Sequence, residues 1–131
     1  MTGASRTNRD ERPGRKRFHI LVGRALRRLP APLRDRISNV AIVVEEEPTP
    51  AQLAEAGVGP DATLLGLYTG IPLTERTTNY GMVLPDRITI FRRPIIEMCD
   101  SEEELMDQVR RTVLHEIGHH FGMSEEELGG Y

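Results

Sequence analysis

Residues 101–121 constrain the fold most, because they predict one long amphipathic helix. Ser101 and Glu104 form a capping box at its start, and Gly122 can end it in the left-handed conformation. Apolar residues recur at every fourth position, namely at Leu105, Val109, Val113, Ile117 and Phe121. Because such a stripe packs against another layer of the protein, we expect the rest of the chain to supply a sheet that covers it.

The opposite side of this helix carries two histidines one turn apart. At about 100° per residue, His115 and His119 each lie about 160° from Ile117 and point away from the apolar stripe. They can bind one metal ion, and Glu116 lies beside that ion without being forced to bind it. His120 lies only about 60° from Ile117, where we expect packing or hydrogen bonding. A histidine pair at this spacing also arises for structural reasons, so the pentapeptide is a weak signal when taken alone.

A third metal ligand is available from the segment that follows the helix. A left-handed turn at Gly122 would bring Glu125 back toward the ion. Glu125 has a second interpretation, because Ser124 and Glu127 form another capping box, whose first turn favours acidic residues. The two interpretations are compatible, since a capped turn would fix the position of Glu125. Asp100 or a water molecule is the substitute ligand.

The chain resembles the zincin metallopeptidases at five motif positions, which are His115, Glu116, His119, Gly122 and Glu125. The short chain and its acidic C-terminal segment are similar to the minimal zincin family of small bacterial zinc-dependent peptidases. This resemblance implies an α+β, zincin-like single domain. In that fold a small mixed sheet packs against helices, and the motif lies on the central long helix.

The resemblance also implies a function for the site. His115, His119 and Glu125 would bind one zinc ion, although the minimal family has Asp where this chain has Glu125. Glu116 would be the catalytic general base that acts on a metal-activated water, so that the protein hydrolyses peptide bonds as a zinc-dependent metallopeptidase.

Two tyrosines are candidates for oxyanion or site support, namely Tyr80 and Tyr131. Tyr131 either folds back beside the metal or belongs to a disordered C-terminus. The alternative function is a zincin-like binding or regulatory module with little or no proteolytic activity. This alternative arises because so short a chain has little material to wall off the far side of a cleft.

Two helices and two strands are predicted in the first half of the chain. Residues 18–29 have apolar residues at helical spacing, and residues 39–45 are a β-branched run typical of a buried strand. Thr49 caps a short helix over residues 50–57, and residues 64–68 form a second strand. The prolines in residues 30–32 indicate a turn.

A third strand is predicted after Pro85, where polar and apolar residues alternate. The arginines and the proline that flank it favour an edge position. In zincins an edge strand beside the site aligns an extended substrate by backbone pairing, and the resemblance implies this role for Arg87, Ile88, Thr89, Ile90 and Phe91.

Charge divides the chain into two parts. Residues 1–36 hold eleven Lys or Arg and three acidic residues, a formal charge of +8, while the remainder carries −11. The two parts should therefore attract each other. Residues 1–17 have no apolar periodicity and predict a disordered basic N-terminal arm, followed by the metallopeptidase domain over residues 18–131. The arm is either a solubilising tail or a site for nucleic acid or another acidic partner, although it has no aromatic residues to stack on bases.

Composition sets the remaining expectations. A length of 131 residues with 38% apolar content fits one domain with one modest core. The single cysteine, Cys99, excludes an internal disulfide, and we find no signal peptide and no membrane span. We therefore expect a cytoplasmic protein, monomeric or homodimeric, whose partner is a peptide or protein substrate.

Overall fold

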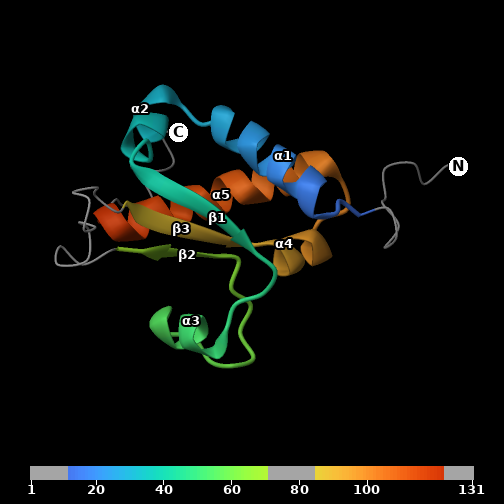
Figure 1. The fold of residues 1–131 in the computed structure, drawn as a ribbon, viewed down its shortest axis with the longest axis vertical. Coiled ribbons are helices and arrows are strands. Elements are labelled where there is room, and N and C mark those ends of the chain that lie inside the picture. The colour runs from blue at the N-terminus through green and yellow to red at the C-terminus, as the bar shows by residue number, and fades with distance from the viewer. Residues whose placement is uncertain (1–11, 71–84, 123–131) are drawn as a thin grey trace, which may run out of the picture.

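The computed structural model describes residues 12–70 and 85–122, which contain five helices and three strands (Figure 1). In chain order the elements are α1 (Arg15–Arg27), α2 (Ala31–Arg36), β1 (Val40–Glu45), α3 (Pro50–Glu55), β2 (Gly66–Thr69), β3 (Asp86–Phe91), α4 (Arg92–Met98) and α5 (Glu102–Phe121). This combination of several helices with one small sheet confirms the predicted α+β class.

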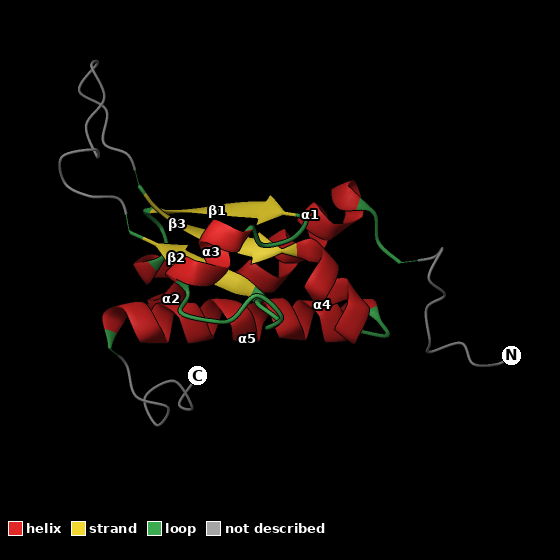
Figure 2. Cartoon of the chain, turned by 90° about the horizontal axis from the view of Figure 1, so that it is seen from below, coloured by secondary structure: helices red, strands yellow, loops and turns green. Residues whose placement is uncertain are grey.

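The three strands form one mixed sheet in the order β1-β3-β2. β1 runs parallel to β3, with Val40 opposite Asp86. β2 runs antiparallel to β3, with Leu67 opposite Thr89. Figure 2 shows the sheet lying over α5, which runs along its length.

The edge position predicted for one strand is wrong, namely that of Arg87, Ile88, Thr89, Ile90 and Phe91. β3 is the central strand and pairs with a neighbour on each side. Thr89 is only 2% exposed, so the alternation of polar and apolar residues does not mark a face in contact with water. The arginines and Pro94 that follow β3 form the first turn of α4, so they are not evidence that β3 lies at an edge of the sheet.

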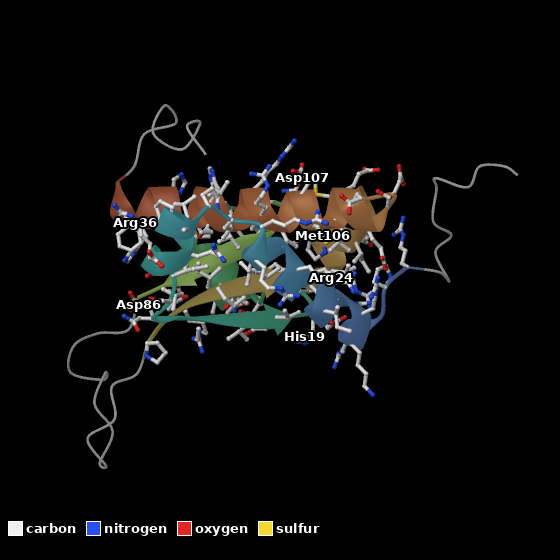
Figure 3. The ribbon with its side chains drawn as sticks, turned by 90° about the horizontal axis from the view of Figure 1, so that it is seen from above. His19, Arg24, Arg36, Asp86, Met106 and Asp107 are labelled. Carbon is white, nitrogen blue, oxygen red and sulfur yellow. The ribbon has the colours of Figure 1, made fainter. Side chains whose placement is uncertain are left out.

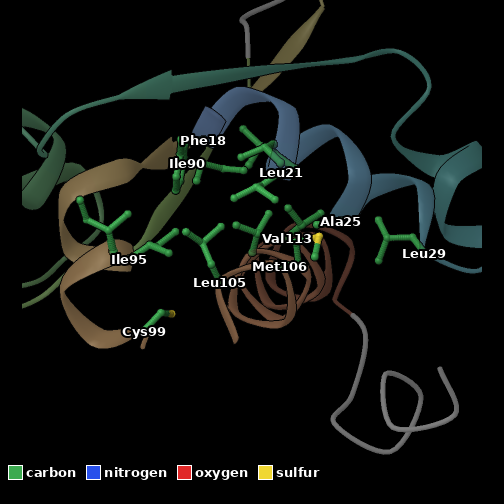
Figure 4. Close-up of a cluster of buried hydrophobic side chains, with 14 of the residues drawn as sticks. Phe18, Leu21, Ala25, Leu29, Ile90, Ile95, Cys99, Leu105, Met106 and Val113 are labelled. Atoms are coloured by element: carbon green, nitrogen blue, oxygen red, sulfur yellow. The ribbon is translucent and has the colours of Figure 1, made fainter. Parts of the chain in front are cut away.

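One apolar core joins α1, α4, α5 and β3 (Figure 4). The predicted stripe of α5 supplies four of its members, each at most 1% exposed, namely Leu105, Val109, Val113 and Ile117. Phe121, the fifth residue of the stripe, is 42% exposed. Because α1 packs directly on α5, Phe18 and Leu21 meet this stripe in the interior, where both are fully buried. One side of α5 is therefore buried in the core.

Helix ends follow the predicted turn chemistry only in part, because at the start of α5 the Glu104 carboxylate accepts from the Ser101 hydroxyl at 3.5 Å and not from the Ser101 N–H that a full capping box uses. Thr49 completes a capping box at the start of α3. The Ser101 side chain accepts a hydrogen bond from the Glu104 N–H at the start of α5, and Gly122 ends that helix with a φ of 66°. Two short helices, α2 and α4, were not predicted. Both carry a proline in the first turn, where no intrahelical N–H bond is needed.

The attraction expected between the basic and acidic parts is visible between α1 and α5. Arg17 pairs with Glu102 at 2.7 Å, and Arg28 pairs with Glu103 at 3.2 Å. α1 begins at Arg15, so the last three residues of the predicted arm are helical, while residues 1–11 lie outside the described part. None of the described helices combines the length and the apolar character needed to cross a membrane.

Candidate metal centre

The side of α5 that faces away from the core carries the histidine pair. His115 and His119 are exposed, whereas Ile117 between them is fully buried. The centroids of the two imidazole rings are 4.2 Å apart. The helix therefore has the two-sided character that the sequence predicts, with both rings next to each other and open to solvent.

Glu116 joins the two histidines in one cluster. One potential ligand atom from each of the three side chains lies within 4.8 Å of the others. Glu116 is partly buried, and its Oε1 accepts a hydrogen bond from the Tyr68 N–H of β2 at 2.8 Å. The carboxylate is therefore held from the side of the sheet, while the imidazoles project from the helix.

A cavity of about 520 Å³ opens beside this cluster. His115, Glu116 and His119 line one side of it together with Thr112. The facing wall comes from the chain before and within β2 and is apolar, with Val58, Leu64, Leu65 and Leu67 among its members. The cluster thus lies at a space large enough to admit part of an extended peptide.

The donor set fits zinc. Two ligand nitrogens at about 2.0–2.1 Å from one zinc ion are at most about 4.2 Å apart, which small side-chain rotations reach from the observed cluster. A set of imidazole nitrogens with a carboxylate also favours zinc over hard cations such as calcium, which take oxygen ligands. The residues present therefore suit a zinc ion, with Glu116 beside it.

Three of the predicted site residues lie outside the described residues, namely Glu125, Tyr80 and Tyr131. Asp100, the substitute ligand, is excluded by position. It precedes α5, fifteen residues before His115, and a rise of about 1.5 Å per residue separates the two by roughly 20 Å. The third protein ligand thus stays a prediction that centres on Glu125.

His120 occupies the position expected for a packing residue. Its ring stacks on Tyr68, with centroids 3.8 Å apart and an angle of 14° between the planes. Its Nε2 lies 3.8 Å from an oxygen of the Asp86 carboxylate. The third histidine of the motif segment therefore faces β2 and the start of β3.

Sequence reasoning missed two residues at this site, Gly66 and Tyr68 of β2. A Cβ atom at Gly66 would lie 2.6 Å from Cγ2 of Thr112 and 3.9 Å from Cγ of Glu116, so glycine lets β2 approach α5 closely. An isolated glycine inside a strand pattern is a signal for such an approach. The role of Tyr68 has no comparable signal, because its main-chain N–H is what contacts Glu116.

Cys99 takes no part in the site. It is buried beside α4 and α5, and this burial raises the pKa of its thiol to about 11. The thiol therefore stays protonated at neutral pH, whereas metal ligation and nucleophilic attack both need the thiolate.

Comparisons with known proteins agree with this fold and show the family of the chain. A model of the zincin-like metallopeptidase family matches residues 37–130. Among solved structures, a conserved hypothetical protein from Thermo thermophilus is similar, with a TM-score of 0.52 and 22% identity over 89% of this chain and 98% of that one. At this identity the likeness supports the fold only. No curated protein matches the chain.

Proposed function

The chain belongs to the zincin-like metallopeptidase family, and from this premise we propose that it is a zinc-dependent peptidase with Glu116 as its general base. The observation that carries the proposal is the cluster of His115, Glu116 and His119 at the mouth of the cavity. A neutral donor pair with an adjacent carboxylate is the arrangement that peptide hydrolysis on zinc requires.

In the proposed site His115 and His119 hold the metal through their imidazole nitrogens, and Glu125 supplies the third ligand. Zinc, when bound, polarises a carbonyl and lowers the pKa of a coordinated water toward about 7. Glu116 takes a proton from the attacking water and passes it to the leaving amine. A carboxylate oxygen of Glu116 lies within 4.8 Å of a potential ligand atom on each histidine, so a water held by the metal would lie next to it.

We propose that the substrate lies extended along β2. Of the described strands, β2 is the edge strand that contacts α5. The carbonyl of Leu65 accepts a bond from the Phe91 N–H of β3, so by alternation Gly66 presents its main chain away from β3. A peptide paired there would place one side chain against the apolar wall of the cavity. We therefore propose aliphatic side chains as the preferred contact, with Tyr80 or Tyr131 as oxyanion support.

The test is metal content together with peptide turnover. We expect about one zinc per chain, and hydrolysis of a broad peptide library by the wild type. Glu116→Gln should keep the zinc and lower kcat/KM by about 10²–10⁴-fold, because it removes the proton acceptor and leaves the imidazoles. The control is Glu103→Gln, at an exposed carboxylate on the first turn of the same helix, which should leave both quantities unchanged.

Two outcomes would contradict this proposal. Full activity in Glu116→Gln would remove the general-base assignment. Zinc binding without turnover by the wild type would favour the binding or regulatory module over the peptidase. We further propose that the protein is cytoplasmic and that its partner is a peptide or protein substrate.

A further inference from the structure

A hydrogen bond to the Glu116 side chain joins β2 to α5. The Tyr68 N–H donates to Glu116 Oε1 at 2.8 Å, across 48 positions of the chain. A hydrogen bond from a main-chain N–H to a carboxylate is charge-assisted and directional. One oxygen of the carboxylate is therefore fixed by the sheet, and the other is left for proton transfer.

The distance between β2 and α5 is set by Gly66. A Cβ at this position would lie 2.6 Å from Thr112 Cγ2 and 3.2 Å from the Thr89 carbonyl oxygen. Thr112 is 6% exposed, and a β-branched side chain in a helix has few rotamers to choose from. Any larger residue at Gly66 would therefore push the strand away from the helix, and the Tyr68 N–H with it.

Tyr68 is itself held from a second direction. Its hydroxyl donates to Oδ2 of Asp86 at 2.9 Å, and its ring is stacked on His120. The Phe121 ring meets it edge-on, with centroids 6.3 Å apart. Figure 3 shows Asp86 at the end of the molecule where α5 finishes. These contacts tie the position of the Tyr68 main chain to both β3 and the last turn of α5.

We propose that Gly66 and Tyr68 are positioning residues for the general base. Gly66 allows the close approach of the strand, and the Tyr68 N–H orients the Glu116 carboxylate toward the metal side of the cavity. This inference rests on the proposed function and adds to it the way in which the base is aimed. A proton acceptor must be placed within hydrogen-bonding reach of the group it deprotonates, so a displaced carboxylate lowers kcat even when the metal ligands are intact.

The matched variants are Gly66→Ala, Thr112→Ser and their combination. Gly66→Ala introduces the clash with Cγ2 of Thr112, and Thr112→Ser removes that methyl group while it keeps the hydroxyl that accepts from Gln108. We expect Gly66→Ala to lower kcat about tenfold or more, the effect of losing one charge-assisted hydrogen bond, with a smaller change in KM and unchanged zinc content. In the double variant, measured against Thr112→Ser, most of this loss should be recovered.

A second measurement does not depend on turnover. Hydrogen exchange of the Tyr68 amide, followed by NMR in the full chain, should be about tenfold slower in the wild type than in Glu116→Ala. Gly66→Ala should speed this exchange, and Thr112→Ser should slow it again in the double variant. If Gly66→Ala fails to fold, the comparison of wild type with Glu116→Ala decides whether the contact exists.

The outcomes separate the two proposals. Equal exchange of the Tyr68 amide in wild type and Glu116→Ala would overturn the positioning role. So would an undiminished kcat in Gly66→Ala, or a loss that Thr112→Ser does not recover. A wild type that binds zinc and hydrolyses no peptide would instead contradict the proposed function, and the exchange data would still show whether Tyr68 orients Glu116.

Discussion

At the scale of residues, α5 carries three histidines with different surroundings. His115 and His119 are exposed beside the cavity, while His120 stacks on Tyr68 and points toward Asp86. Their positions on the helix predict this division, because His120 lies close to the apolar stripe and the other two do not. The chemistry of each ring thus follows from the direction in which the helix projects it.

Removal of either His115 or His119 should abolish zinc binding. His115→Ala and His119→Ala each leave at most two protein ligands, too few for a stable zinc site. The control is His120→Ala, which should retain zinc and lose about 0.5–1.5 kcal/mol of stability with the stacked Tyr68 ring. Elemental analysis and urea unfolding measure the two effects. Loss of zinc in His120→Ala would show that this histidine belongs to the metal site after all.

At the scale of elements, α5 is a helix of 20 residues that both builds the core and presents the site. Ser101 starts it in an extended conformation and Gly122 ends it in the left-handed one. These two residues set where the helix starts and stops, while the apolar stripe sets its rotation about its own axis. The orientation of the histidine pair is therefore a consequence of how α5 packs.

Loss of the N-cap should weaken α5 from its first turn. Ser101→Ala removes the acceptor for the Glu104 N–H, which is 3.1 Å from the hydroxyl. We expect a loss of about 0.5–2 kcal/mol in the free energy of unfolding, measured in urea. Ser38→Ala is the control, since that exposed hydroxyl donates to the Asp35 carbonyl within a local turn, and its change should stay within about 0.5 kcal/mol. Equal effects of the two changes would argue against a capping role for Ser101.

At the scale of the whole molecule, α1 and α5 close the domain although they are far apart in the chain. Their apolar side chains share one core, and Arg17 holds both carboxylate oxygens of Glu102, at 2.8 and 2.7 Å. The hydrogen bond from Arg17 lowers the pKa of the Glu102 carboxyl below its usual range. The stabilisation that this pair gives to the packing of α1 on α5 therefore depends on pH.

The contribution of this pair should disappear in acid. Because the folded pKa of Glu102 is below the unfolded value of about 4.3, the stabilisation is complete above that pH and is lost as the pH falls through the folded value. Glu102→Gln should lower the urea midpoint slightly at pH 7 and leave it unchanged near the acid limit. Since the pair is partly exposed, high salt should shrink the difference at pH 7. A difference that grows in acid would contradict this assignment.

The sequence alone was sufficient for α5, its cap and the direction of its histidines. Each of these depends on residues within a few positions of one another on a helix, whose geometry is fixed by the backbone. The strand segments were found for a similar reason, since β-branched runs favour extended chain. Local spacing therefore predicted the long helix and the three residues of the candidate metal cluster, while the resemblance to zincins supplied the α+β class.

Only the tertiary structure decided which strand lies at the centre and what reaches Glu116. Strand order depends on which segments bury each other. The polar residue Thr89 suggests a face in contact with water, but β3 is the central strand and Thr89 is buried. The contact of Tyr68 with Glu116 joins residues 48 positions apart through a main-chain N–H, a group that every residue except proline possesses. A sequence records side-chain identity and local spacing, whereas such long-range contacts exist only once the whole chain has packed.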